Sequence, residues 1–152
     1  MKYIKTYNKI FENTKTILSY SNRNLTILPE LPNTLEVLYC QNNNLTELPE
    51  LPDTLKLLYC YNNNLTELSK LPESIEDFDC SNNKFENLPN LPNTLIYLDC
   101  RNNKLIELPE LPETLEELYC DGNKLPYINL SGYKKWYAKT YPERIEAKKY
   151  NL

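Results

Sequence analysis

Five cysteines give this chain its most evident chemical potential, because thiols bind metals, form disulfides and act as nucleophiles. They recur at intervals of 20 residues, at Cys40, Cys60, Cys80, Cys100 and Cys120. On neighbouring parallel strands such residues project side by side, at about the 4.8 Å strand spacing rather than the ~3.8 Å between disulfide-linked Cβ atoms. A straight column also cannot surround zinc tetrahedrally. We therefore predict five small buried hydrophobic residues, with no catalytic, metal or cofactor role.

The cysteines mark one position of a longer pattern, LxxLxCxxNxLxxLPxLPxx, which repeats along the chain. Its copies open at Leu35, Leu55, Ile75, Leu95 and Leu115, and a degenerate copy opens at Lys15. Terminal repeats are usually atypical, so we count six units. The predicted organisation is an N-terminal cap over 1–14, six repeats over 15–130 and a C-terminal helical cap over 131–152.

Each unit predicts one short strand followed by an extended segment. Alternation of period 2 turns Leu38 and Cys40 inward and residues 37, 39 and 41 outward, and the strands of successive units stack in parallel. The paired prolines of LPxLP exclude helix and favour a polyproline-like path, with Leu48 and Leu51 in the core. The predicted fold is thus a solenoid of six parallel one-strand units.

Both ends of the array predict short helical caps, because an open sheet edge needs cover. At the N-terminus an apolar stripe has helical spacing: Tyr3, Ile4, Tyr7, Ile10 and Phe11. At the C-terminus Ser131 is the predicted cap of a helix carrying Tyr133, Trp136 and Tyr137, and Pro142 suits the first turn of a second helix bearing Ile145.

The run LPELPxTLxxLYCxNNxLTELPELP occupies 28–52 and recurs at 48–72 with Ser69 and Lys70 replacing Pro and Glu. It resembles the bacterial type of leucine-rich repeat, known from type III secreted effectors, and is similar to arrays in giant viruses. The resemblance implies a leucine-rich repeat solenoid whose sheet lines a concave face. It also implies a buried ladder of amides that bond loop backbone of neighbouring units, formed by Asn43, Asn63, Asn83, Asn103 and Asn123. The preceding column is assigned to the turn, because Asn tolerates left-handed backbone: Asn42, Asn62, Asn82 and Asn102.

Charge is unevenly distributed along the sequence. Residues 15–125 carry 8 basic and 18 acidic residues, whereas both flanking segments are basic. An acidic array argues against a nucleic-acid groove along the repeats. The sequence has no apolar run of about 18 residues and no hydrophobic segment after Met1, so we expect neither a membrane span nor a signal peptide. Unpaired thiols favour a reducing cytoplasm, of the producing organism or of a host.

The outward strand positions predict a zoned binding surface. Its first half is aromatic and apolar, and its second half is acidic with tyrosines and an arginine interspersed. The candidate partner-binding residues are Val37, Tyr39, Leu57, Tyr59, Tyr61, Asp77, Asp79, Tyr97, Asp99, Arg101 and Tyr119. Grouped exposed tyrosines are typical of protein interfaces, although Tyr also suits strands in general. Adjacent aspartates on a sheet need a counter-charge: Arg101, a basic segment of the partner or a hard cation such as calcium.

These features predict a non-enzymatic module that binds a protein or peptide on its concave sheet face. The chain has no histidine and no glycine-rich phosphate loop, so conventional catalysis lacks its groups. Ligase effectors of similar repeat type carry a cysteine nucleophile after the repeats; no cysteine follows Leu125 here, so we expect no such activity. Two alternatives stay open: a specificity or adaptor subunit of a separate enzyme such as a ubiquitin ligase, and a structural protein of a cell surface or virion.

The inward position of the cysteines generates a first prediction. All five thiols should resist alkylation in the native protein and react together on unfolding, as followed by mass spectrometry. Cys80→Val should keep the fold, whereas Cys80→Asp should destabilise it, because an unpaired buried carboxylate costs far more than a small volume change. Fast labelling of several native cysteines would contradict the inward orientation.

Overall fold

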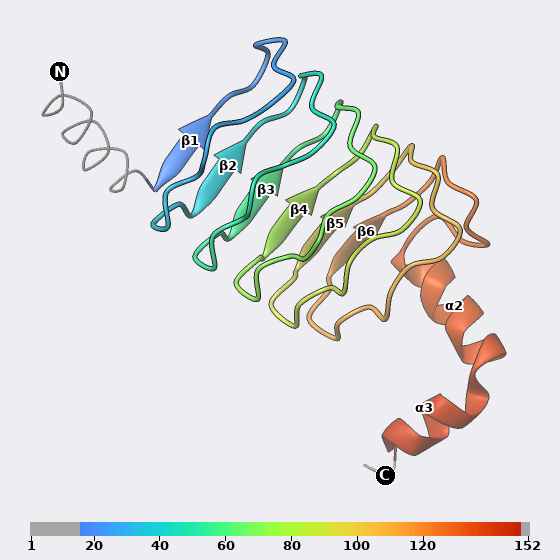
Figure 1. Ribbon diagram of the computed structural model, residues 1–152. Coiled ribbons are helices and arrows are strands. Elements are labelled where there is room, and N and C mark those ends of the chain that lie inside the picture. Colours follow the sequence, from blue (N-terminus) through green and yellow to red (C-terminus); the bar gives the residue numbers. More distant parts are fainter. Residues whose placement is uncertain (1–15, 150–152) are drawn as a thin grey trace, which may run out of the picture.

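Six parallel strands and two helices form the described part of the chain, residues 16–149 of a computed structural model (Figure 1). The predicted N-terminal cap over 1–14 lies outside these residues. The strands, one per unit, are β1 (Ile17–Ser19), β2 (Val37–Tyr39), β3 (Leu57–Tyr59), β4 (Asp77–Asp79), β5 (Tyr97–Asp99) and β6 (Glu117–Tyr119). The helices are α2 (Leu130–Thr140) and α3 (Pro142–Lys149).

The strands pair in sequence order, from β1 to β6, and every pair is in register at the period of the repeat. Leu38 thus faces Leu58, and Tyr39 faces Tyr59. Each chain turn is one coil of the solenoid, and the extended segments stack on the side away from the sheet (Figure 1). The predicted solenoid is therefore confirmed, and residues 20 apart form straight columns.

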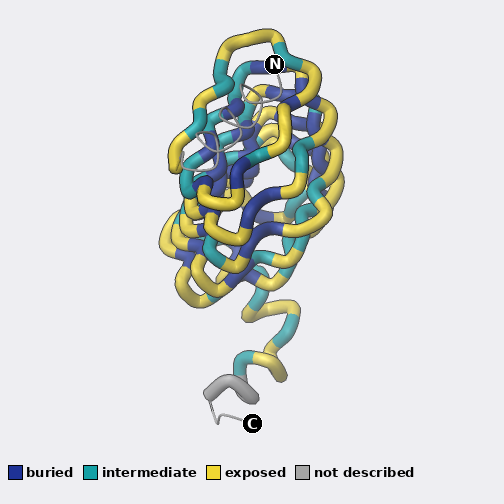
Figure 2. The backbone as a smooth tube through the Cα atoms, turned by 60° about the vertical axis from the view of Figure 1, so that its left-hand side comes forward, coloured by how far each residue is buried: buried dark blue, intermediate teal, exposed yellow. Residues whose placement is uncertain are grey.

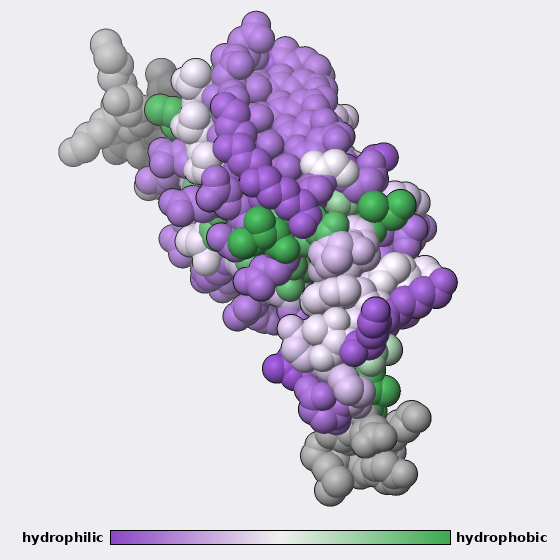
Figure 3. Space-filling model, turned by 90° about the vertical axis from the view of Figure 1, so that its right-hand side faces the viewer, coloured by the Kyte–Doolittle hydropathy of each residue, from purple (hydrophilic) through white to green (hydrophobic). Residues whose placement is uncertain are grey.

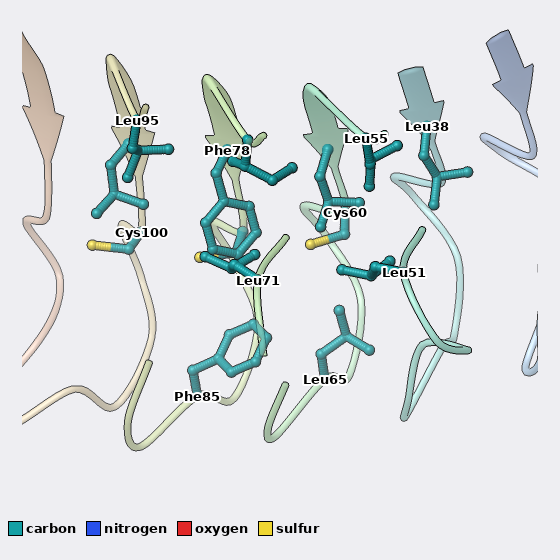
Figure 4. Packing of buried hydrophobic residues seen from close by; sticks show 14 of the residues in the cluster. Leu38, Leu51, Leu55, Cys60, Leu65, Leu71, Phe78, Phe85, Leu95 and Cys100 are labelled. Carbon is teal, nitrogen blue, oxygen red and sulfur yellow. The ribbon is translucent and has the colours of Figure 1, made fainter. Parts of the chain in front are cut away.

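Buried residues recur in every coil of the solenoid (Figure 2). Most of them are leucines and cysteines, which form one core cluster. Leu38 and Leu58 are fully buried, and Phe78 and Phe85 replace aliphatic residues in the fourth unit (Figure 4). The five cysteines are free and buried, as predicted. Burial raises the pKa of the Cys40 thiol to about 12 and raises that of Cys80 well above its ordinary value. These thiols stay protonated, which makes them poor nucleophiles.

The asparagine ladder joins each unit to the preceding one. Asn83 Nδ2 donates to the carbonyls of Cys60, 3.0 Å away, and Cys80, 3.1 Å away. Its Oδ1 accepts the Leu65 backbone N–H at 3.0 Å. Asn63 and Asn103 repeat this arrangement. Because one buried amide satisfies backbone groups of two units, the predicted ladder is confirmed.

The column before the ladder occupies the turn, also as predicted. Asn42, Asn62, Asn82 and Asn102 have φ values of 53 to 58°, in the left-handed region. Gly122 takes the same place in the last unit with φ 72°. A Cβ at Gly122 would clash with the side-chain amide of Asn102, so the glycine permits both the backbone conformation and the close approach.

A column of hydroxyls was missed in the sequence. Thr54 Oγ1 donates to the carbonyls of Asn33 and Leu35, at 2.9 and 2.8 Å. Ser74 and Thr94 make the equivalent bonds one and two units later. This column lies in the turn before each strand, where the hydroxyls satisfy carbonyls 19 and 21 residues earlier in the chain. Its sequence signal was the recurrence of Ser or Thr before each opening Leu or Ile.

The extended segments run along the side opposite the sheet without regular secondary structure. Leu51 is buried and Leu48 packs against the core, whereas Glu47 and Glu50 are exposed. In each unit the turn that returns to the strand is closed by a bond such as Leu55 N–H to Pro52 C=O, 3.0 Å. The prolines therefore fit a path whose leucines point inward, as the pattern predicted.

Helix α2 packs against the last coil, and α3 follows it away from the coils (Figure 1). The Cys120 N–H donates to the Ile128 carbonyl at 3.3 Å, and Tyr127 stacks edge-on against Tyr133 of α2 with ring centroids 5.2 Å apart. Seen from this end, the surface is mostly hydrophilic and apolar side chains gather above the helices (Figure 3). The predicted cap residue was wrong: Asn129, not Ser131, accepts the Gly132 N–H at 2.9 Å and caps α2. Asn129 and Ser131 are two positions apart in the chain, and both residue types are favourable N-caps.

The ladder predicts a large difference between adjacent asparagines. Asn83→Leu should lower the free energy of unfolding by about 1 to 3 kcal/mol, because buried backbone groups lose their partner. Asn82→Gly should change it by less than about 0.5 kcal/mol, since its amide is exposed and glycine accepts positive φ. Chemical denaturation of both variants measures the difference. Equal losses would show that the buried amides carry no special weight.

Candidate functional site

The outward side chains of the six strands form one surface, here called the sheet face. Strand register places two rows of them across the sheet. A third row comes from the residue two positions beyond each strand, where backbone bonds between neighbouring coils continue. The rows run Ile17, Val37, Leu57, Asp77, Tyr97, Glu117; then Ser19, Tyr39, Tyr59, Asp79, Asp99, Tyr119; then Ser21, Gln41, Tyr61, Ser81, Arg101, Asp121. The structure thus gathers all eleven predicted partner-binding residues on one face and preserves their zoning.

The first zone, called the tyrosine patch, consists of Val37, Tyr39, Leu57, Tyr59 and Tyr61, all half-buried. Tyr39 and Tyr59 meet edge to face with ring centroids 5.6 Å apart. The Tyr59 hydroxyl donates to Asp77 Oδ2 at 3.1 Å. Burial, followed by the charge of Asp77, raises the pKa of Tyr59 to about 12. The patch is therefore ordered before any partner arrives, which reduces the entropy lost on binding.

Asp99 departs from the expectation of an exposed acid. It is 1% exposed and lies beneath Arg101. The Arg101 Nε and Nη2 groups donate to Asp99 Oδ2 at 3.0 and 2.5 Å, and the Arg101 backbone N–H donates to Oδ1 at 3.0 Å. Of the three counter-charges considered from the sequence, Arg101 neutralises Asp99. A binding role for Asp99 would therefore act through this pair.

Asp77 and Asp79 have neutral donors instead. Asp79 Oδ1 accepts the Ser81 backbone N–H at 2.9 Å, and Asp77 accepts only the Tyr59 hydroxyl bond described above. Asp77 Oδ1 is buried and has no hydrogen-bond partner. Burial raises the pKa of both carboxyls, although the hydrogen bonds partly oppose it. Neither of these two carboxylates has a salt-bridge partner in the described residues.

The far end of the sheet face joins aromatic rings to Arg101. Its guanidinium lies 5.3 Å from the Tyr119 ring centroid, within cation–π range. Tyr97 and Tyr119 rings are 5.8 Å apart, and the Tyr119 hydroxyl donates to Glu117 at 3.1 Å. Tyr119 remains 41% exposed. This end is thus a preformed network that can offer both rings and charge.

Other chemistry finds little support in the described residues. Within 16–149 no three His, Cys, Asp or Glu side chains are grouped to hold a metal ion. The helices found there are too short or too polar to cross a membrane. On the opposite side, sequence reasoning missed open hollows between extended segments. One of them, about 740 Å³, is lined by Leu31, Pro49, Leu51 and Lys70 among others.

Known proteins share this architecture. A family model described as Leucine Rich Repeat matches residues 34–53, and no curated protein matches the chain. A solved "Shigella effector LRR domain" is similar with TM-score 0.75 and 36% identity, covering 84% of this chain and 58% of that one. YopM from Yersinia enterocolitica WA-314 is similar with TM-score 0.69 and 31% identity, over 80% of this chain and 32% of YopM. YopM from Yersinia pestis, titled a leucine-rich effector protein, gives TM-score 0.61 and 40% identity over 73% and 38%.

The repeat, its fold and these likenesses define the class of fold: the chain folds as a leucine-rich repeat solenoid. Within that class it is similar to the repeat regions of the Shigella and Yersinia effectors, as the sequence pattern predicted. The chain spans less than two thirds of the length of each of these three relatives. Proteins of this class commonly serve as scaffolds for protein interaction, and their partners differ.

The Asp99 pair generates a stability prediction. Arg101→Ala should destabilise the fold by about 1 to 3 kcal/mol, because a buried carboxylate loses its charged partner. Adding Asp99→Asn should recover part of the loss, since the amide keeps an acceptor for the residue 101 N–H and needs no cation. Thermal or urea unfolding provides the double-mutant cycle. Lys56→Ala, which breaks the exposed 3.2 Å bridge to Glu36, is the control and should cost under about 1 kcal/mol.

Proposed function

We propose that this chain is a non-enzymatic recognition module that binds a protein or peptide on its sheet face. The observation that carries the proposal is the tyrosine patch, where apolar and aromatic side chains are gathered and ordered without being fully buried. Tyrosine anchors supply contact area at low entropic cost, and the hydroxyls supply directed bonds. The acidic zone beside the patch suits a partner that carries a basic segment.

A second candidate is a specificity or adaptor subunit that acts with a separate enzyme. Its support is the likeness to a domain of a Shigella effector and to the Yersinia effectors, whose chains extend beyond the matched part. Both candidate functions use the same sheet face. They differ in whether a separate enzyme acts together with this chain. The buried thiols favour work in a reducing compartment, the cytoplasm of the producing organism or of a host.

Site-specific cross-linking tests the proposal. A photoreactive phenylalanine placed at Tyr59 should capture a partner, whereas the same group at exposed Glu47 on the opposite side should not. Tyr59→Ala should then weaken binding of the captured partner by about 2 kcal/mol or more, with little dependence on salt. Capture from position 47 together with unchanged binding by Tyr59→Ala would move the interface to the other side. Recovery of an enzyme with the partner would favour the adaptor.

A further inference from the structure

The two short acids of β4 lie between taller aromatic side chains. Asp77 and Asp79 project from β4, Tyr59 stands on β3 and Tyr97 on β5, and all four are half-buried. Because neighbouring strands are about 4.8 Å apart, the two tyrosine-bearing strands are separated by about 10 Å. The Tyr59 hydroxyl reaches Asp77 Oδ2 within this separation, and Asp77 and Asp79 stay half-buried beside the rings. These four residues are called the β4 trough.

The electrostatics of the trough are incomplete. Asp99, one strand further, has its own guanidinium, whereas Asp77 and Asp79 have only neutral hydrogen-bond donors. Asp77 Oδ1 is buried without any donor, which is unfavourable for a carboxylate oxygen. Glu117 acts on Asp77 and Asp99 acts on Asp79 with unfavourable like charge, and the charge of Arg101 only partly offsets this at Asp79. A cation that enters the trough would relieve these costs.

The fifth unit shows which cation suits this backbone. Asp99 and Asp79 are oriented alike, each with Oδ1 accepting the N–H of the residue two positions later. In the fifth unit that later residue is Arg101, which pairs with Asp99 and lies over the Tyr119 ring. In the fourth unit it is Ser81, which supplies no charge. The carboxylates and rings are therefore present at β4, and the guanidinium is missing.

We propose that the partner bound on the sheet face places one arginine side chain in the β4 trough, over Asp77 and Asp79 and between Tyr59 and Tyr97. This inference rests on the proposed function. A planar guanidinium can bond carboxylates along its edge and stack against rings, which an ammonium group does less well. The segment that carries the arginine extends over the tyrosine patch, where its apolar side chains contact Val37 and Leu57.

Titration of the full chain with N-acetyl-arginine methylamide, followed by amide NMR shifts, tests the trough directly. Saturable shifts are expected in β3, β4 and β5, weaker with the lysine analogue and absent with the uncharged citrulline analogue. Asp77→Asn with Asp79→Asn should reduce the arginine affinity about tenfold, the effect of losing a charge-assisted bond. The matched control, Glu50→Gln with Asp53→Asn, removes the same charge from exposed positions on other segments and should leave the affinity unchanged.

The outcomes separate this inference from the proposed function. The proposed arginine site in the trough is refuted if the citrulline analogue binds as tightly as the arginine analogue, or if both double variants lose the same arginine affinity. If the lysine analogue binds as tightly as the arginine analogue, the preference for arginine is refuted. A captured partner that is lost with Tyr59→Ala but unaffected by the Asp77 and Asp79 changes would refute the trough and keep the interface. Specific arginine binding by a chain whose partner ignores Tyr59 would refute the interface alone. Sedimentation of the wild-type chain should show a monomer. If the chain instead associates with itself, and Asp77→Asn with Asp79→Asn abolishes that association, the arginine comes from a second copy of the chain and the proposal of a separate partner is refuted.

Discussion

The structure depends on one interaction, the bonding of each buried ladder amide to backbone groups of two successive units. A coil of this solenoid contributes a strand of only three residues, and backbone bonds to neighbouring coils continue on both sides of it. The buried carbonyls at the turn after the strand would still lack donors without the ladder amide. Asn63 and its equivalents supply both donors and an acceptor at that point. No smaller polar side chain offers both functions with this reach. The amide therefore holds the spacing that lets the leucines pack.

That constraint also defines the surface available for recognition. Inward positions must remain apolar and ladder positions must remain asparagine, but the outward strand residues meet no such demand. They stand in register across the sheet, so neighbouring units combine their side chains into patches. The Tyr39 and Tyr59 pair and the Asp99 and Arg101 pair are two results of the same geometry. Stability and specificity thus reside in different columns of one repeat.

The repeat predicted the parts of the fold that depend on periodicity, including the buried cysteines, the turn asparagines and the membership of the sheet face. Features that depend on side-chain conformation were less accessible. Arg101 lies two residues beyond Asp99, the last residue of β5, and only the three-dimensional arrangement shows that the arginine folds back over the acid. Asn129 and Ser131 are both suitable caps, so a local preference could not choose between them. The Thr and Ser column was visible in the sequence, but its carbonyl partners belong to another unit.

The regular register has a consequence for how such a chain can evolve. Segments 28–52 and 48–72 share 19 of 25 residues, and their strands pair in register. Unequal recombination between them would add or remove a whole unit without disturbing the ladder, because every interior junction is chemically equivalent. Each such event would insert or delete one row of outward side chains. The solenoid therefore allows recognition surfaces to diversify by genetic duplication while folding is preserved.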